Sequence, residues 1–402
     1  MGDPRRGEEG PDSFVTREED PQPPSLFLAA LTEEEDVDRG EEIHLFHARQ
    51  VDQRARKIPR PDLDRPLDRL HVQFPRAVDH RSTGQGYHAV VGGGVGARYH
   101  GDVAARIRVG TSGYSFADWF GVVYPQGARQ GDLLSYYARL FDTVEINVTY
   151  YRVPGPQMFA GMLRKVPSDF TFVLKLPKEM THEREKLGQI AAPFARAAAP
   201  LVDAGRLGGL LAQFPWAFKP SSASIDHLRR LADALAGVKA PVNVEFRHAS
   251  WYAEETYRAL RDLGLGFVNV DLPALPDLPP PSNVLTSDVA YYRLHGRNKA
   301  TWWSRGEGDV RYDYLYERSE LEDWALRAEE GAACSQACFI FANNCHLGQS
   351  VVNALQLRER FSLPDPALPP GADAGMFAPS AEELAAEMRR RIRAARAESS
   401  KG

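Results

Sequence analysis

The sequence predicts an α/β protein built on a (β/α)8 barrel, the TIM-barrel fold. Short apolar runs that end on polar or charged residues recur eight times between residues 107 and 343. Segments with the pattern of amphipathic helices separate most of these runs, which is typical of parallel βαβ units. Eight such units in about 240 residues match the usual size of a closed barrel. In that fold the carboxyl ends of all strands face one shared pocket, so we expect the functional site there.

The predicted strands are the short apolar runs themselves. In chain order they are Ile107–Gly110, Val144–Asn147, Phe170–Lys175, Leu207–Phe214, Val242–Arg247, Gly266–Asp271, Ala290–His295 and Ala337–Asn343. The helices predicted between and after them are Asp132–Phe141, Pro156–Lys165, Leu187–Ala204, Ser224–Leu235, Tyr252–Leu263, Glu320–Glu330 and Gly348–Phe361. After the sixth strand, Pro273–Pro281 replaces a helix, because proline lacks the amide donor and clashes inside a helix.

The barrel is expected to occupy residues 106–362, with an extension on either side. Residues 1–105 are predicted to be a disordered extension, because their opening is rich in Glu, Asp, Pro and Gly and cannot offset the entropy of ordering. Residues 363–402 combine a proline-rich segment with a charged helix, predicted from Ala381 to Ala397 and interpreted as a surface tail.

Composition narrows the class of protein. The 402 residues are 43% hydrophobic and 26% charged, with a formal net charge of -5, which is ordinary for a soluble protein and predicts no bulk attraction to nucleic acid or membrane. No apolar run approaches the roughly 20 residues that cross a bilayer, so we expect a cytoplasmic protein without membrane contact. The three cysteines, Cys334, Cys338 and Cys345, are an odd number too low for a disulfide framework. Their expected places, at the end of a helix, the start of the last strand and beyond that strand, cannot easily meet at one zinc ion, so they are predicted to be thiols.

Polar side chains that could carry chemistry stand at the ends of the predicted strands. Glu145, Glu245, Asp271 and His295 are the candidate catalytic residues, as acids and bases whose pKa values neighbouring groups could shift. The same carboxylates and imidazole could instead hold a divalent metal, and the sequence leaves that choice open.

A second set of strand-end residues could bind an anion. Guanidinium groups bind phosphate and carboxylate bidentately, and the backbone amides of the glycine turn at 110–113 suit an anion as well. The expected ligand-binding residues are Ser112, Tyr114, Asn147, Lys175, His182, Gln213, Arg247, Arg293, Arg297, Asn343 and Asn344. A purely structural interpretation competes with this one, because acids and bases inside a barrel can neutralise one another without binding anything.

Aromatic residues are concentrated in the loop after the seventh strand, interleaved with charges. Aromatic and cationic side chains together suit stacking on bases or sugars, although the rings could instead pack over the barrel mouth. The loop contains Trp302, Trp303, Tyr312, Tyr314 and Tyr316, and Trp119, Tyr124 and Trp216 could join the same rim.

Ordered motifs at these strand ends resemble a known family. They are Gly110-Thr111-Ser112-Gly113-Tyr114, Val144-Glu145-Ile146-Asn147 with Tyr150-Tyr151-Arg152, Thr181-His182, Gln213-Phe214-Pro215, Glu245-Phe246-Arg247-His248, Arg293-Leu294-His295-Gly296-Arg297 and Asn343-Asn344. Together they look like the YecE-like family, a domain of unknown function, over residues 106–361. The resemblance implies a TIM barrel similar to endonuclease IV-like and sugar isomerase barrels, but it supplies no reaction. Histidines at the strand ends are sparse, which disfavours a multi-zinc site.

The leading hypothesis is a barrel that binds an anionic ligand at its C-terminal face. The ligand would be a phosphate ester, a sugar phosphate or nucleic acid, and an enzyme of this kind would be a hydrolase or a lyase. One alternative is a non-catalytic nucleic-acid-binding protein that uses the aromatic loop. Another is a carbohydrate-active enzyme with Glu145 and Glu245 as paired carboxylates, which requires a suitable separation between them.

Overall fold

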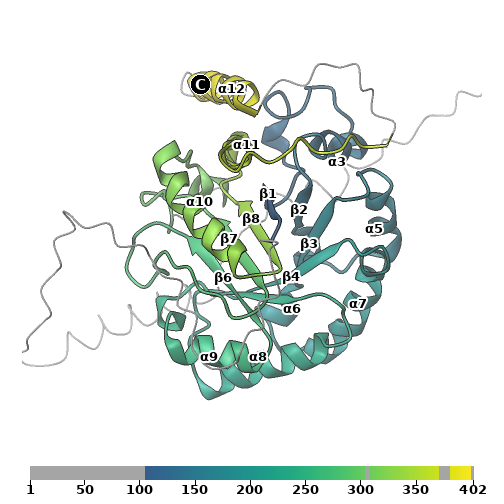
Figure 1. Ribbon diagram of the computed structural model, residues 1–402, viewed down its shortest axis with the longest axis vertical. Coiled ribbons are helices and arrows are strands. Elements are labelled where there is room, and N and C mark those ends of the chain that lie inside the picture. The colour runs from purple at the N-terminus through teal and green to yellow at the C-terminus, as the bar shows by residue number, and fades with distance from the viewer. Residues whose placement is uncertain (1–104, 304–307, 371–380, 400–402) are drawn as a thin grey trace, which may run out of the picture.

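The computed structural model describes residues 105–303, 308–370 and 381–399. Within these ranges, eight parallel strands form one sheet in the order β1-β8-β7-β6-β5-β4-β3-β2 (Figure 1). The strands are β1 (Ile107–Thr111), β2 (Thr143–Ile146), β3 (Thr171–Lys175), β4 (Leu207–Gln213), β5 (Val242–Glu245), β6 (Gly266–Asp271), β7 (Val289–Leu294) and β8 (Ala337–Ala342). Each strand lies where the apolar runs predicted it, while the expectation for residues 1–104 falls outside the described residues.

The two ends of the sheet meet at β1 and β2 and nearly close a barrel. Ser112 and Glu145 form a parallel bridge there, and the backbone N–H of Gly113 donates to the Glu145 carbonyl at 2.8 Å. Gly110 permits this approach, because a Cβ at that position would lie 2.4 Å from the carbonyl oxygen of Thr143. The prediction of a TIM barrel is confirmed.

Helices surround the sheet, as Figure 1 shows. They are α3 (Leu133–Tyr137), α4 (Val148–Tyr151), α5 (Pro156–Leu163), α6 (Lys178–Thr181), α7 (Leu187–Asp203), α8 (Ser222–Leu235), α9 (Glu254–Asp262), α10 (Arg318–Ala333), α11 (Gln349–Arg360) and α12 (Ala381–Ser399). The segment from 272 to 288, which joins β6 to β7, contains no helix, so the effect expected of its prolines is confirmed.

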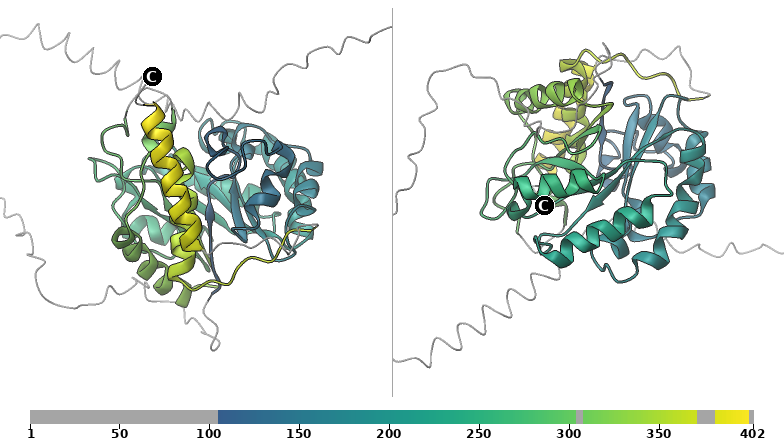
Figure 2. Two further views of the ribbon diagram at one scale, coloured as in Figure 1. Left: turned by 90° about the horizontal axis from the view of Figure 1, so that it is seen from above. Right: turned by 60° about the horizontal axis from the view of Figure 1, so that its bottom comes forward.

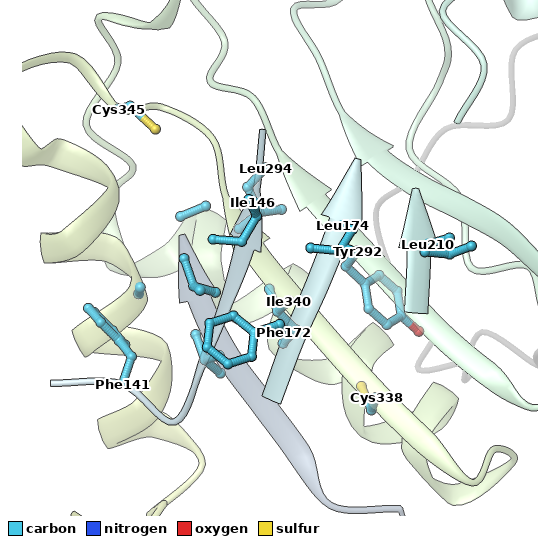
Figure 3. Packing of buried hydrophobic residues seen from close by; sticks show 14 of the residues in the cluster. Phe141, Ile146, Phe172, Leu174, Leu210, Tyr292, Leu294, Cys338, Ile340 and Cys345 are labelled. Carbon is cyan, nitrogen blue, oxygen red and sulfur yellow. The ribbon is translucent and has the colours of Figure 1, made fainter. Parts of the chain in front are cut away.

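Apolar side chains form two layers, one on each face of the sheet. The outer layer packs between strands and helices; Figure 3 shows Ile146, Phe172 and Leu174 from β2 and β3 within it. The inner layer fills the barrel and includes Val173 and Phe341. Successive side chains along a strand point to opposite faces of the sheet, so only every second residue can reach the barrel interior.

The last helix is not a detached tail. It lies along the outside of the barrel against α11 (Figures 1 and 2). Ala385, Met388 and Ile392 share one face by their spacing of three and four residues, and all three are buried. The interpretation of this helix as a surface tail is therefore wrong. No helix in the described ranges has the length and apolar character needed to cross a membrane.

Candidate functional site

Arg293, on β7, is the centre of a buried ion network inside the C-terminal end of the barrel. Its side chain is 2% exposed. Nε and Nη2 donate to the two carboxylate oxygens of Glu145 at 2.9 and 2.7 Å, and Nη1 donates to Glu245 Oε2 at 2.5 Å. Nη2 also donates to Ser112 Oγ at 3.1 Å. One guanidinium thus links residues from β2, β5, β7 and the turn after β1. Figure 1 shows β1, β2 and β7 in the barrel wall.

The second oxygen of Glu245 faces two further groups. Arg247 donates its Nε to Glu245 Oε1 at 2.5 Å, and His295 Nε2 lies 3.2 Å from the same oxygen. Burial opposes ionisation of Glu245, but Arg293 and Arg247 outweigh it and hold the pKa of this carboxyl well below its ordinary value. Glu245 is therefore ionised at neutral pH and has no proton to donate.

His295 is fully buried and neutral at physiological pH. Burial first, and then the charge of Arg247, lower its pKa to about 3. The side-chain amide of Asn343 donates to Nδ1 at 2.8 Å, which assigns the ring proton to Nε2, the nitrogen beside Glu245. Asn343, directly after β8, thus orients the imidazole, with Nε2 on the side of Glu245.

Tyr291 completes this network, and the sequence analysis did not assign it to the site. Its hydroxyl donates to Glu145 Oε2 at 2.6 Å. The sequence does indicate that Tyr291 belongs to the site, because Tyr291, Arg293 and His295 are two residues apart and alternate residues of a strand point to the same face.

A pocket lies at the C-terminal end of the barrel, with Arg293 in its lining. The lining consists of Asn147, Tyr150, Tyr151, Lys175, Gln213, Arg247, Arg293, Tyr312 and Asn343. Three of these side chains are cations, and the part of the lining that the structure describes contains no carboxylate. The empty space is about 360 Å³ when the open mouth is counted, whereas the enclosed part, about 20 Å³, has room for little more than one water molecule.

Tyr150 and Tyr151 line this pocket from α4, directly after β2. The ammonium of Lys175 lies 4.2 Å from the centre of the Tyr150 ring, a cation–π contact. His182 packs edge-on against the same ring at 5.1 Å. Sequence reasoning assigned no pocket role to these tyrosines, although the Tyr150-Tyr151-Arg152 motif contributed to the family resemblance.

Asp271 and Arg297 lie apart from the central network. Asp271 is four residues after Phe267 on β6, so the two side chains lie on the same face of the strand, and Phe267 belongs to the outer apolar layer. It accepts from Arg297 Nε at 2.8 Å, and Arg297 Nη1 donates to Glu320 on α10 at 2.9 Å. Burial raises the pKa of Asp271 despite this pairing. The expectation that both residues join the other strand-end groups is wrong, because they form a separate network between the sheet and α10.

Two further candidate residues also lie outside the pocket lining. Tyr114 packs on Tyr137 in the outer layer, with ring centres 6.1 Å apart. The side-chain amide of Asn344 donates to the Tyr314 carbonyl at 2.7 Å and to Asn353 Oδ1 at 2.8 Å, so it fixes the loop after β7 to α11. Both contacts are structural.

The central carboxylates do not form a divalent metal site. Each oxygen of Glu145 and Glu245 already faces a donor of the protein, and a guanidinium lies between the two groups. A divalent cation there would have to displace Arg293. Among the described residues, no group of three His, Cys, Asp or Glu side chains is arranged to hold a metal. The three cysteines form no disulfide in the described part of the chain.

Only part of the expected aromatic rim exists. Trp303 is 45% exposed and meets Trp216 edge-on at 6.2 Å. Trp302 is buried in the inner layer, and Trp119 and Tyr124 are buried in the outer one. The expectation that Trp119 and Tyr124 join the rim is therefore wrong.

Comparison with known proteins places this barrel in a family. A family model described as "Protein of unknown function DUF72" matches residues 108–374, about two thirds of the chain. The chain belongs to the DUF72 family. This confirms the resemblance to YecE-like proteins, and the matched segment of the DUF72 chain contains every residue of the central network.

Several relatives of this DUF72 chain support the assignment. The UPF0759 protein YunF of Bacillus subtilis (strain 168) is 26% identical over 269 residues, which cover 63% of this chain and 94% of YunF. The UPF0759 protein YecE of Escherichia coli (strain K12) is 30% identical over 156 residues, which cover 37% of this chain and 56% of YecE.

Solved structures of DUF72 proteins have the same fold. One from Thermotoga maritima MSB8 is 41% identical, with a TM-score of 0.59 over 64% of this chain and 99% of that one. Another, from Enterococcus faecalis V583, is 23% identical with a TM-score of 0.60 over 67% and 100% of the two chains, and it supports the fold alone.

Proposed function

We propose that the interior pocket binds the anionic group of a small ligand, with a phosphate ester as the best fit. One observation carries this proposal: Lys175, Arg247 and Arg293 line the pocket, and no carboxylate is among the described residues of its lining. Together with the buried Glu145 and Glu245, the described residues at this pocket carry three positive and two negative charges, a net charge of +1. An anion would meet this excess directly.

The carboxylates support this role by positioning the cations. Glu145 fixes two nitrogens of Arg293, and Glu245 fixes Arg247, so neither guanidinium needs to be ordered when a ligand binds. Their own oxygens are already occupied by protein donors. Ligand binding, rather than hydrolase or lyase chemistry, is therefore the function that this geometry supports best, since the ionised Glu245 and the neutral His295 do not line the pocket.

A carbohydrate-active enzyme fits the network less well. Paired catalytic carboxylates must flank the bond that they cleave. Glu145 and Glu245 flank the Arg293 guanidinium instead, which occupies the position a sugar would need.

A nucleic-acid ligand is the second candidate, favoured by one feature of the rim. The exposed Trp303 meets Trp216, and Lys219 Nζ lies 4.4 Å from the Trp216 ring centre. Such a platform could stack an unpaired base beside a phosphate site. The test is the affinity for a single-stranded oligonucleotide between 50 and 200 mM salt, on the order of the range over which phosphate contacts lose affinity steeply. A flat response would exclude this candidate.

The anion proposal is tested by isothermal titration calorimetry on the full chain. Lys175→Met should weaken binding of inorganic phosphate by roughly tenfold or more, because a charge-assisted hydrogen bond contributes about 1.5–3 kcal/mol. Lys239→Met is the matched control, since Lys239 is exposed and does not line the pocket. Equal phosphate affinity in the two variants would refute the proposal.

A further inference from the structure

Tyr312 lines the interior pocket from the long segment that joins β7 to α10. The other described lining residues lie on a strand, just after one, or on the short helix α4, whereas Tyr312 lies well beyond the end of β7. Its ring packs edge-on against Trp302, with 6.4 Å between the ring centres. The position of Tyr312 therefore depends on what holds this segment against the barrel.

Hydrogen bonds inside the segment fix its shape. The side-chain amide of Asn298 donates to the Val310 carbonyl at 3.0 Å and to the Asp313 carbonyl at 3.2 Å. The Thr301 hydroxyl also donates to the Val310 carbonyl, at 2.9 Å. Each of these bonds joins two parts of the same segment, so the place of the segment on the barrel depends on other contacts.

The carboxylate of Asp313, the residue after Tyr312, is held from outside the segment by two helices. Gln349 begins α11 and is fully buried, and its Nε2 donates to Asp313 Oδ1 at 2.6 Å. Arg396, near the end of α12, donates its Nη2 to the same oxygen. His346 Nε2 lies 4.0 Å from Oδ2. Asp313 thus connects the backbone at Tyr312 to α11 and α12.

The docking of α12 places Arg396 beside this segment. Ile392 belongs to the buried face of the helix and lies one turn before Arg396. Arg391 donates its Nη1 to the Gly121 carbonyl at 2.8 Å, in the segment between β1 and β2. The helix lies along the outside of the barrel (Figure 2) and reaches both the segment after β1 and the segment after β7.

We propose that α12 positions Tyr312 at the interior pocket through the ion pair between Arg396 and Asp313, and so controls ligand affinity there. The proposal rests on the proposed function of that pocket. With the pair intact, Asp313 holds the neighbouring Tyr312 in the pocket wall. Without the pair, a ligand must order the segment around Tyr312 when it binds, which lowers its affinity.

The expected effect is modest, because the pair is partly exposed and other contacts remain. The side chains of Arg396 and Asp313 are 45% and 31% exposed, and Asn344 still holds the Tyr314 carbonyl. Arg396→Gln should weaken the binding of inorganic phosphate by about two- to fivefold in calorimetric titrations of the full chain, the range expected of such a pair. Arg396→Lys keeps the charge and should restore most of the affinity.

Arg393→Gln is the matched control, because Arg393 is exposed on the same helix and forms no ion pair within the described ranges. It should leave phosphate affinity unchanged. Both variants should melt within about 4 °C of the wild type, since only surface charges change. In a Tyr312→Ala background, Arg396→Gln should have no further effect on phosphate affinity, because it acts through Tyr312. A loss of affinity that persists in that background would overturn the proposal.

Amide hydrogen exchange followed by mass spectrometry needs no ligand and separates this proposal from the proposed function. The amides of residues 310–316 should exchange faster in Arg396→Gln than in the wild type or in Arg393→Gln. Equal exchange would overturn the proposal, and so would faster exchange with unchanged phosphate affinity. If the wild type binds no phosphate, the proposed function of the pocket fails, whereas faster exchange in Arg396→Gln still supports the link from α12 to Tyr312.

Discussion

Replacing Arg293 should destabilise the barrel strongly, because two buried carboxylates depend on it. Arg293→Met removes three hydrogen bonds to Glu145 and Glu245 and one to Ser112. Both carboxylates are fully buried, so neither can turn to water for compensation. Breaking a buried ion pair from one side typically costs about 3–5 kcal/mol. With roughly 2–4 °C per kcal/mol for a domain of this size, the melting temperature should fall by roughly 6–20 °C.

Urea unfolding and thermal melts followed by circular dichroism measure this loss. Arg318→Met is the control, because Arg318 pairs with Glu359 and Glu382 at the surface and should change stability by less than about 1 kcal/mol. Adding Glu145→Gln and Glu245→Gln to Arg293→Met should recover much of the loss, since neither buried carboxylate charge is then left without its guanidinium partner. A loss below about 1 kcal/mol in Arg293→Met, or no recovery in the triple variant, would refute the reasoning.

Three further predictions concern other parts of the fold. In the folded protein the pKa of His295 is about 3, below its ordinary 6.5, so the unfolded chain binds more protons and the free energy of unfolding should fall as pH drops from about 6.5 to 3. His295→Asn should flatten this part of a plot of urea midpoint against pH. An unchanged slope would contradict the assignment of a buried, neutral His295. Gly331→Ala places a Cβ 2.1 Å from the Tyr292 hydroxyl and should cost about 1–3 kcal/mol in thermal melts, whereas Gly237→Ala, with open space around it, should not. Ile392→Asp should release α12 and expose it to limited proteolysis; unchanged resistance would show that this buried face does not hold the helix.

The alternation of residues along single strands predicted part of the central network. Residues two apart on a strand share a face, so Glu245 and Arg247, and likewise Arg293 and His295, were expected to act together. The structure places all four in the central network. The apolar spacing in α12 also carried its signal, but the density of charge in that segment suggested a solvated tail instead.

The case of Asp271 shows why pattern could not decide the rest. Strands of a parallel barrel are buried on both faces, so both sets of alternate residues are apolar. The alternation therefore does not show which set faces the barrel interior and which faces the helices. Every residue of β6 is buried, and nothing in its sequence distinguishes the interior face from the face toward α10.

The sequence by itself determined the barrel, because repeated apolar runs separated by amphipathic helices leave few ways to bury every strand. It also placed polar groups at the carboxyl end. Only the tertiary structure decided which charges satisfy one another. The contact of Arg293 with Glu145 joins residues 148 positions apart, and ion pairing at that separation depends on barrel closure rather than on any local preference.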